Sequence, residues 1–97
     1  MSDIPIYQIA FSIHAIKRMF ERSISKTDVL HVLATGEVIK EYPRDTPYPS
    51  QLVLGWCGNR PLHVTVAIDA NAQKMYIITV YEPDVNQWKP NFRRKNL

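Results

Sequence analysis

The spacing of the apolar residues changes at Gly36, and this change limits the folds open to the chain. Before it, residues 13–22 and 26–35 repeat apolar side chains at helical spacing, whereas four later runs are typical of strands. The four predicted strands are residues 37–42, 51–57, 62–68 and 75–81. Short turns between the later runs imply that consecutive strands pair antiparallel. The sequence therefore predicts an α+β fold, with two N-terminal helices packed on an antiparallel meander of three to four strands.

Local signals mark the ends of the two predicted helices. Ser12 and Ser25 stand where N-caps are expected, and Asp28 completes a pattern that resembles a capping box. Gly36 ends the second helix, as glycine does just past a C-cap. Upstream, residues 4–11 are predicted to form a short first strand. The helix residues predicted to face the core are Ile13, Ala15, Ile16, Met19, Phe20, Val29, Leu30, Val32 and Leu33.

Length and composition indicate one small domain over residues 1–97. The hydrophobic fraction of 45% suits a globular protein, and Cys57 is the single cysteine, so no intramolecular disulfide can form. No run approaches the roughly 20 apolar residues of a membrane span, and the first residues lack the pattern of a signal peptide. We therefore expect a cytoplasmic protein that has no membrane partner.

A row of one histidine and two arginines lies along the first predicted helix. His14, Arg18 and Arg22 are four residues apart, so they follow one flank of the helix, beside the core-facing side chains. A structural interpretation is that this row hydrogen-bonds strand ends, or pairs with Glu21 and Glu82. A functional interpretation needs a partner from another part of the chain.

The third predicted strand supplies such a partner. Leu62, Val64 and Val66 share the face that the helices would cover, so His63 falls on the opposite face or at its margin. By itself, a histidine in a strand is more often a hydrogen-bonded structural residue. His31, on the outward side of the second helix, is expected to be exposed to solvent.

The net charge of +3 is concentrated in the tail, residues 84–97, whose last thirteen residues hold four basic side chains and no acid. Pro90 discourages a regular helix, so we expect an irregular segment anchored by Trp88 and Phe92. Aromatic and cationic side chains together suit single-stranded RNA, because aromatics stack on bases and cations bind phosphates. Alternatively, the aromatics only dock the tail and the cations contact an acidic partner. The candidate RNA- or partner-binding residues are Trp88, Arg93, Arg94 and Lys95.

The order of several short motifs resembles that of a known family. The motifs are His14-Ala15-x-x-Arg18-Met19-x-x-Arg22, Ile24-Ser25 with Val29, Leu62-His63-Val64, and Thr79-Val80-Tyr81-Glu82-Pro83-Asp84. Together they are similar to small, largely uncharacterised prokaryotic proteins of the RelE/BrnT-like toxin superfamily. The resemblance implies a RelE-like domain with a curved sheet, ribonuclease activity, and pairing with a small antitoxin, sometimes of a zinc-ribbon kind.

RNA cleavage without metal needs a base for the 2′-hydroxyl, cations for the phosphate and an acid for the leaving oxygen. Histidine suits proton transfer, and the planar fork of arginine binds two phosphate oxygens. We therefore interpret His63 or His14 as the base, Arg18 and Arg22 as a phosphate clamp, and Tyr81 as a base-stacking group or acid. If this is correct, the helix row shares one cleft with His63 or Tyr81.

Two other interpretations remain open. A metal site could use His14 and His63 with Asp69 or Glu82, but no pair has the spacing of metal ligands, so no metal or cofactor is expected. The second is a non-catalytic RelE-fold module that holds a protein or nucleic-acid partner through the tail and residues 43–49.

Overall fold

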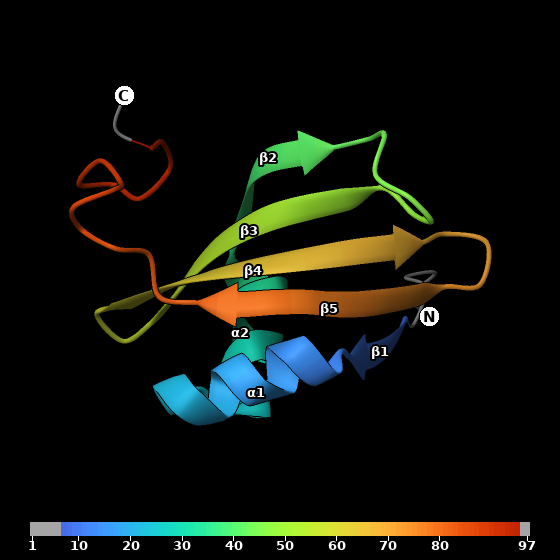
Figure 1. The fold of residues 1–97 in the computed structure, drawn as a ribbon, viewed down its shortest axis with the longest axis horizontal. Coiled ribbons are helices and arrows are strands. Elements are labelled where there is room, and N and C mark those ends of the chain that lie inside the picture. Colours follow the sequence, from blue (N-terminus) through green and yellow to red (C-terminus); the bar gives the residue numbers. More distant parts are fainter. Residues whose placement is uncertain (1–6, 96–97) are drawn as a thin grey trace, which may run out of the picture.

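The structure, a computed structural model, describes residues 7–95. It contains two helices and five strands (Figure 1). In chain order, the elements are β1 (Gln8–Phe11), α1 (Ile13–Arg22), α2 (Lys26–Thr35), β2 (Glu37–Tyr42), β3 (Ser50–Cys57), β4 (Arg60–Asp69) and β5 (Lys74–Tyr81). Residues 4–6 of the predicted first strand lie outside the described residues. Neither helix combines the length and the apolar character that crossing a membrane requires.

Both helices begin at the serines that the sequence identified. The Ser12 hydroxyl accepts a hydrogen bond from the Ala15 amide at 2.9 Å, and it also donates to the Ile78 carbonyl of β5. Ser25 and Asp28 form a reciprocal capping box, with both hydrogen bonds at 3.0 Å. These contacts satisfy amide groups that the first helical turn leaves without partners.

The sheet differs from the predicted meander. It is mixed and five-stranded, in the order β1-β5-β4-β3-β2. Strands β2 to β5 pair antiparallel, but β1 precedes the helices and pairs in parallel with β5 at the sheet edge. The α+β class is therefore correct, whereas an all-antiparallel sheet of three to four strands behind N-terminal helices is wrong. The pairing of β1 with β5 brings Ile9 and Phe11 against the core. Short turns predict pairing only between consecutive strands, so they do not predict this contact.

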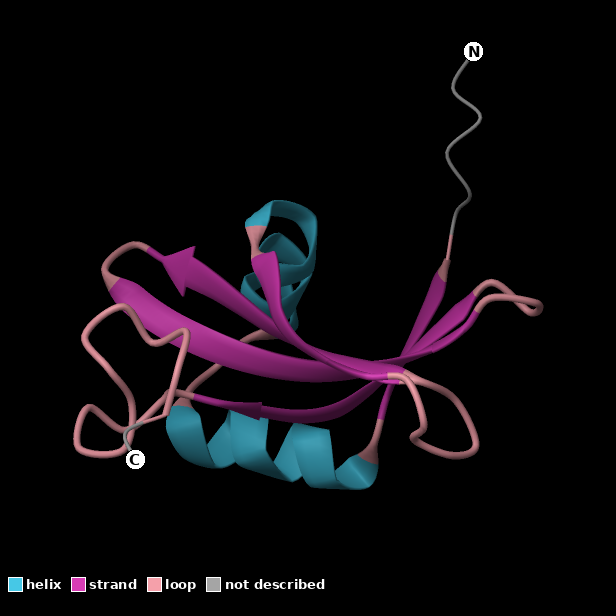
Figure 2. Ribbon diagram, turned by 90° about the horizontal axis from the view of Figure 1, so that it is seen from above, coloured by secondary structure: helices cyan, strands magenta, loops and turns pink. Residues whose placement is uncertain are grey.

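α2 packs on one face of this sheet, and α1 lies along the β5 side of it. α1 lies against β5, and α2 lies against β3 and β4; in the view from above, α1 runs alongside the curved strands (Figure 2). α2 approaches β3 closely at Gly55, where an added Cβ would come within 2.8 Å of a Val32 methyl group. The core between the layers consists of Ala15, Met19, Ile24, Val29, Val32, Val53, Leu62, Val64, Val66, Ile77 and Val80.

The buried side of α1 is narrower than the sequence predicted. Ala15 and Met19 are buried, but Ile13, Ile16 and Phe20 are 87%, 48% and 88% exposed. α1 packs against β5, next to the edge strand β1, so the sheet covers only one line of its side chains. The prediction that these three residues face the core is wrong, and so is that for Leu30 of α2, which is 44% exposed.

The second face of the sheet is covered at one end by the tail. Trp88 is buried there, as its predicted anchoring role requires, and Phe92 packs edge-on against Trp56 of β3. The tail forms a closed loop, because the Lys89 amide donates to the Arg94 carbonyl and the Phe92 amide to the Lys89 carbonyl. This loop brings basic side chains back over the sheet.

Candidate functional site

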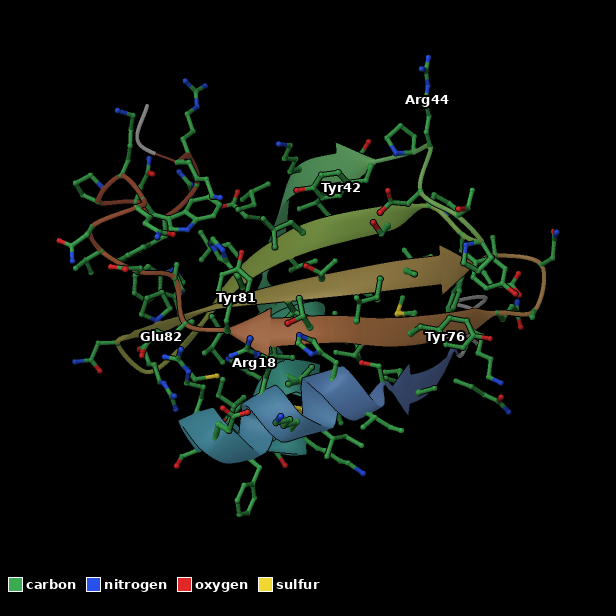
Figure 3. All side chains as sticks on the ribbon, viewed as in Figure 1. Arg18, Tyr42, Arg44, Tyr76, Tyr81 and Glu82 are labelled. Atoms are coloured by element: carbon green, nitrogen blue, oxygen red, sulfur yellow. The ribbon has the colours of Figure 1, made fainter. Side chains whose placement is uncertain are left out.

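The row on α1 opens onto a hollow at the end of β5, which we call the helix cleft. The cleft has a volume of about 330 Å³. Figure 3 shows Arg18 close to Tyr81, with Glu82 following at the end of the strand. The sequence predicted that the row shares a cleft with His63 or Tyr81, and the structure brings it together with Tyr81. The lining residues are His14, Arg18, Arg22, Thr79, Tyr81, Glu82, Asp84, Gln87, Trp88 and Lys95.

α1 is held at this cleft by Arg60 of β4. The Arg60 guanidinium donates to the backbone carbonyls of Arg22 and Ser23 at the end of the helix, and its Nε lies 3.5 Å from a Glu82 carboxylate oxygen. Ion pairs among the described residues join Arg60 to Glu82 and Arg93 to Glu37. None of them joins the row to Glu21 or Glu82, so His14, Arg18 and Arg22 line the cleft without such a pair.

His63 lies beneath the tail and is completely buried. Its Nε2 is 2.9 Å from the Phe92 carbonyl oxygen and its Nδ1 is 3.1 Å from the Tyr81 hydroxyl. A carbonyl only accepts, so Nε2 carries the hydrogen and neutral Nδ1 accepts from the Tyr81 O–H. Burial lowers the pKa of His63, with a smaller opposing effect of the Phe92 carbonyl, which favours this neutral form at pH 7.

These contacts define what His63 can do. Both ring nitrogens are occupied, and the rings of Tyr81 and Trp88 pack edge-on against it at 5.2 Å and 4.3 Å between centroids. In this arrangement neither nitrogen is free to reach a substrate. Of the two histidines considered as a base, His14 is the one that lines the cleft.

Tyr81 is the wall between the helix cleft and a second hollow. Burial, followed by the influence of Tyr42, raises the pKa of Tyr81, so the hydroxyl stays protonated at neutral pH. Its proton is directed at His63. The phenol is therefore better placed to offer its ring to a base than to act as a proton donor.

We call the second hollow the tail hollow; it has a volume of about 400 Å³. It lies between the tail loop and the open part of the second sheet face, and it shares Tyr81, Trp88 and Lys95 with the helix cleft. Four of its lining side chains are cationic and none is acidic. Its lining residues are Ile39, Lys40, Tyr42, Leu52, Tyr81, Trp88, Arg93, Arg94 and Lys95.

Two residues that line this hollow, Lys40 and Tyr42, are not identified by any motif in the sequence. They lie opposite Leu52 and Ser50 of β3 and so face the side of the sheet that carries the tail. The Lys40 ammonium lies 5.4 Å from the centre of the Tyr42 ring. Alternation in residues 37–42 places both on one face, but only the register with β3 shows that this is the tail face.

The predicted tail residues differ in their surroundings. Trp88 is 8% exposed, whereas Arg94 and Lys95 are exposed at the hollow. Arg93 is held by Glu37, with 2.6 Å between its Nε and the carboxylate oxygen. Of the predicted binding cations, Arg94 and Lys95 thus have no ion pair among the described residues.

No group of three or more His, Cys, Asp or Glu side chains within residues 7–95 is arranged to hold a metal ion. Of the residues weighed as ligands, His63 uses both nitrogens internally and Glu82 is paired with Arg60. The side chains that converge on the two hollows are mainly cationic and aromatic, which suits phosphates and bases.

One family model matches the chain, and it is described as a domain of unknown function, DUF4258. No curated protein and no solved structure gives a significant match. The family match covers residues 11–82, well over half of the chain. It includes the row on α1, His63 and Tyr81, and it ends before the tail. The chain therefore belongs to the DUF4258 family.

Proposed function

We propose that the protein is a metal-independent endoribonuclease of the RelE/BrnT-like superfamily. It would act on single-stranded RNA in the cytoplasm, as the toxin of a type II toxin–antitoxin pair. The single observation that carries the proposal is the convergence of His14, Arg18 and Arg22 with Tyr81 around one cleft. The order of motifs that resembles the superfamily supports the toxin role and the expectation of a small antitoxin, which in that superfamily is sometimes of the zinc-ribbon kind.

The cleft supplies the chemistry in the following way. His14 takes the proton of the 2′-hydroxyl, and the resulting oxygen attacks the adjacent phosphorus. Arg18 and Arg22 bind the phosphate oxygens as negative charge develops on them. The bond to the 5′-oxygen breaks, and this oxygen takes a proton from solvent, which reaches the exposed cleft. The products are a 2′,3′-cyclic phosphate and a 5′-hydroxyl, and His14 returns its proton to water.

Tyr81 and His63 support this reaction without exchanging protons with RNA. The Tyr81 ring forms a wall of the cleft and offers a face on which a base next to the cleaved bond can stack. His63 holds the Tyr81 hydroxyl and the tail in place. This assigns His63 a positioning role and leaves His14 as the base.

The second candidate is a non-catalytic module that binds RNA or a protein. The burial of His63 favours it, because among the described residues only His14 then remains as a histidine at the cleft. Such a module would bind RNA in a salt-sensitive manner without cutting it.

One assay distinguishes the nuclease from the non-catalytic module. The purified protein is incubated in EDTA with a fluorescent RNA and with DNA of the same sequence. We expect cleavage of RNA alone, with 2′,3′-cyclic phosphate ends, and a loss of about 100-fold or more in His14→Ala. The matched control is His31→Ala, which changes an exposed histidine on α2 that lines neither hollow. RNA that is bound but left intact would rule out the nuclease and favour the module.

The toxin role has its own test. Expression of the wild-type chain should arrest bacterial growth, and co-expression of the small protein encoded beside it should relieve the arrest. Growth arrest that persists in His14→Ala would separate toxicity from the proposed chemistry.

A further inference from the structure

The tail hollow is more strongly cationic than the helix cleft. Lys40, Arg94 and Lys95 line it, and no acidic side chain does so, whereas the helix cleft also contains Glu82 and Asp84. Glu37 neutralises Arg93, and the other three cations, which have no carboxylate beside them in the lining, favour a phosphate. The volume of about 400 Å³ lies within the range of small-molecule sites, which is roughly 300–1,000 Å³.

Aromatic rings bound the same hollow on two sides. Tyr42 comes from β2 and Tyr81 from β5, and both are partly exposed. They lie on different strands, so the hollow presents separate aromatic faces along its length. The strand register puts both rings on the same face of the sheet, and Figure 3 shows them at separate positions along it. Aromatic faces beside cations are the combination that binds a base and its phosphate together.

The hollow is also preformed. The His63 Nε2–H donates to the Phe92 carbonyl, and Phe92 packs on Trp56, so the tail loop is attached to β3 and β4. The loop is closed within itself at Lys89 and Arg94. The backbone that carries Arg94 and Lys95 is therefore fixed before any ligand arrives, which reduces the entropic cost of binding.

We propose that the tail hollow is a second nucleotide subsite, which binds the nucleotide next to the cleaved phosphate of a single-stranded RNA. Its base stacks on Tyr42, and Lys40 and Arg94 bind its phosphate. Because Tyr81, Trp88 and Lys95 line both hollows, neighbouring nucleotides of one strand occupy the two sites. The position of this nucleotide relative to the cleaved bond rests on the proposed nuclease function; its binding does not.

The test uses RNA that cannot be cut. Single-stranded 2′-O-methyl oligonucleotides lack the 2′-hydroxyl nucleophile, so fluorescence anisotropy with these probes measures binding independently of cleavage. We expect Lys40→Gln and Arg94→Gln each to reduce the slope of log affinity against log salt by about 0.7, the value for one phosphate contact to a single strand. Tyr42→Ala should weaken binding by about 5- to 100-fold and leave the slope unchanged.

Arg44→Gln is the matched control, because Arg44 projects from the loop after β2 and lines neither hollow (Figure 3). It removes the same charge and should leave both affinity and slope near the wild-type values. Tyr42→Leu accompanies Tyr42→Ala and keeps an apolar side chain on β2; it should lose affinity as well, because it cannot stack.

The outcomes are distinct. If Lys40→Gln, Arg94→Gln and Arg44→Gln have equal effects, or if duplex RNA binds as tightly as the single strand, the subsite is overturned. Failure of the wild-type chain to bind the probes at low salt also overturns it. If the variants behave as expected but natural RNA is never cut, the subsite stands and the nuclease proposal fails.

Discussion

The Nδ1 atom of His63 lies 3.1 Å from the hydroxyl oxygen of Tyr81, directly opposite it in the β4–β5 pairing. The other ring nitrogen is bound to the tail through Phe92. One buried imidazole therefore links the end of β5, the middle of the sheet and the tail. The geometry of both hollows depends on this link, because Tyr81 and the tail form walls of each.

The first prediction concerns this hydrogen bond. Tyr81→Phe keeps the ring but leaves the buried Nδ1 without a donor, so we expect the free energy of unfolding to fall by about 1–3 kcal/mol in urea denaturation. The same change in a His63→Gln background should cost measurably less, because the partner nitrogen is already absent. Equal costs in the two backgrounds would show that the contact contributes nothing.

The second prediction is a pH dependence of stability. Burial lowers the pKa of folded His63 below its ordinary 6.5. At a pH between the folded and the unfolded pKa, the unfolded chain binds a proton at His63 and the folded chain does not. The contribution of His63 to stability is therefore fully present above about pH 6.5 and is lost as pH falls through the folded pKa. The expected slope is at most about 1.4 kcal/mol per pH unit. The groups that face the ring are the Tyr81 hydroxyl, the Phe92 carbonyl and the Trp88 ring.

The measurement compares urea midpoints at pH 7.5 and pH 5.0. The stability advantage of wild type over His63→Gln should shrink at pH 5.0, whereas His31→Gln should follow wild type at both values, because His31 is exposed. An advantage that is the same at both pH values would mean that His63 is not kept neutral by burial.

The third prediction concerns activity. Arg18→Gln removes one of the two arginines proposed to bind the phosphate and should slow RNA cleavage by about 10²–10³-fold, a typical effect of losing one transition-state contact. Lys17→Gln is the control: it changes the same charge one residue away, on a side of α1 that lines neither hollow. Equal losses in the two variants would reduce the role of Arg18 to general attraction of RNA.

Features that depend on nearby residues were predicted well from the sequence. The helix starts follow from Ser12, Ser25 and Asp28, whose side chains bond three residues along the chain, so local pattern alone identifies them. The pairing of β1 with β5 joins Phe11 to Ile77 across most of the chain. No turn or alternation encodes such a contact, so a meander was expected instead.

The candidate site also combines local features, which the sequence predicts, with contacts between distant residues, which it does not. The four-residue spacing of His14, Arg18 and Arg22 places them on one side of α1. The alternation of side chains in β5 is consistent with Tyr81 lining the same cleft. The path of the tail depends on contacts of Phe92 with His63 and Trp56, which come from different strands. For this reason the sequence does not show that His63 is buried beneath the tail with both ring nitrogens occupied. It also does not show that Lys40 and Tyr42 form part of a second hollow.

The fourth prediction tests the close approach of α2 to β3. Gly55→Ala would place a Cβ within 3.0 Å of three Val32 atoms, two of them methyl carbons, so α2 must shift. We expect a loss of about 1–3 kcal/mol in the free energy of unfolding. Val32→Ala removes both methyl groups, so the added cost of Gly55→Ala should be smaller in that background. A cost that stays the same would mean that the contact with the α2 backbone dominates.

The fifth prediction uses the narrow buried side of α1. Met19 is 5% exposed and faces the core, so Met19→Ala should lower the free energy of unfolding by about 2–5 kcal/mol. Phe20, the next residue, is 88% exposed, and Phe20→Ser should change stability by no more than about 0.5 kcal/mol, although the removed side chain is larger. The two costs are compared by urea denaturation of otherwise identical chains. If Phe20→Ser were as destabilising as Met19→Ala, α1 would be packed with the wide apolar face that its periodicity predicts, and the row His14, Arg18 and Arg22 would lie farther from Tyr81.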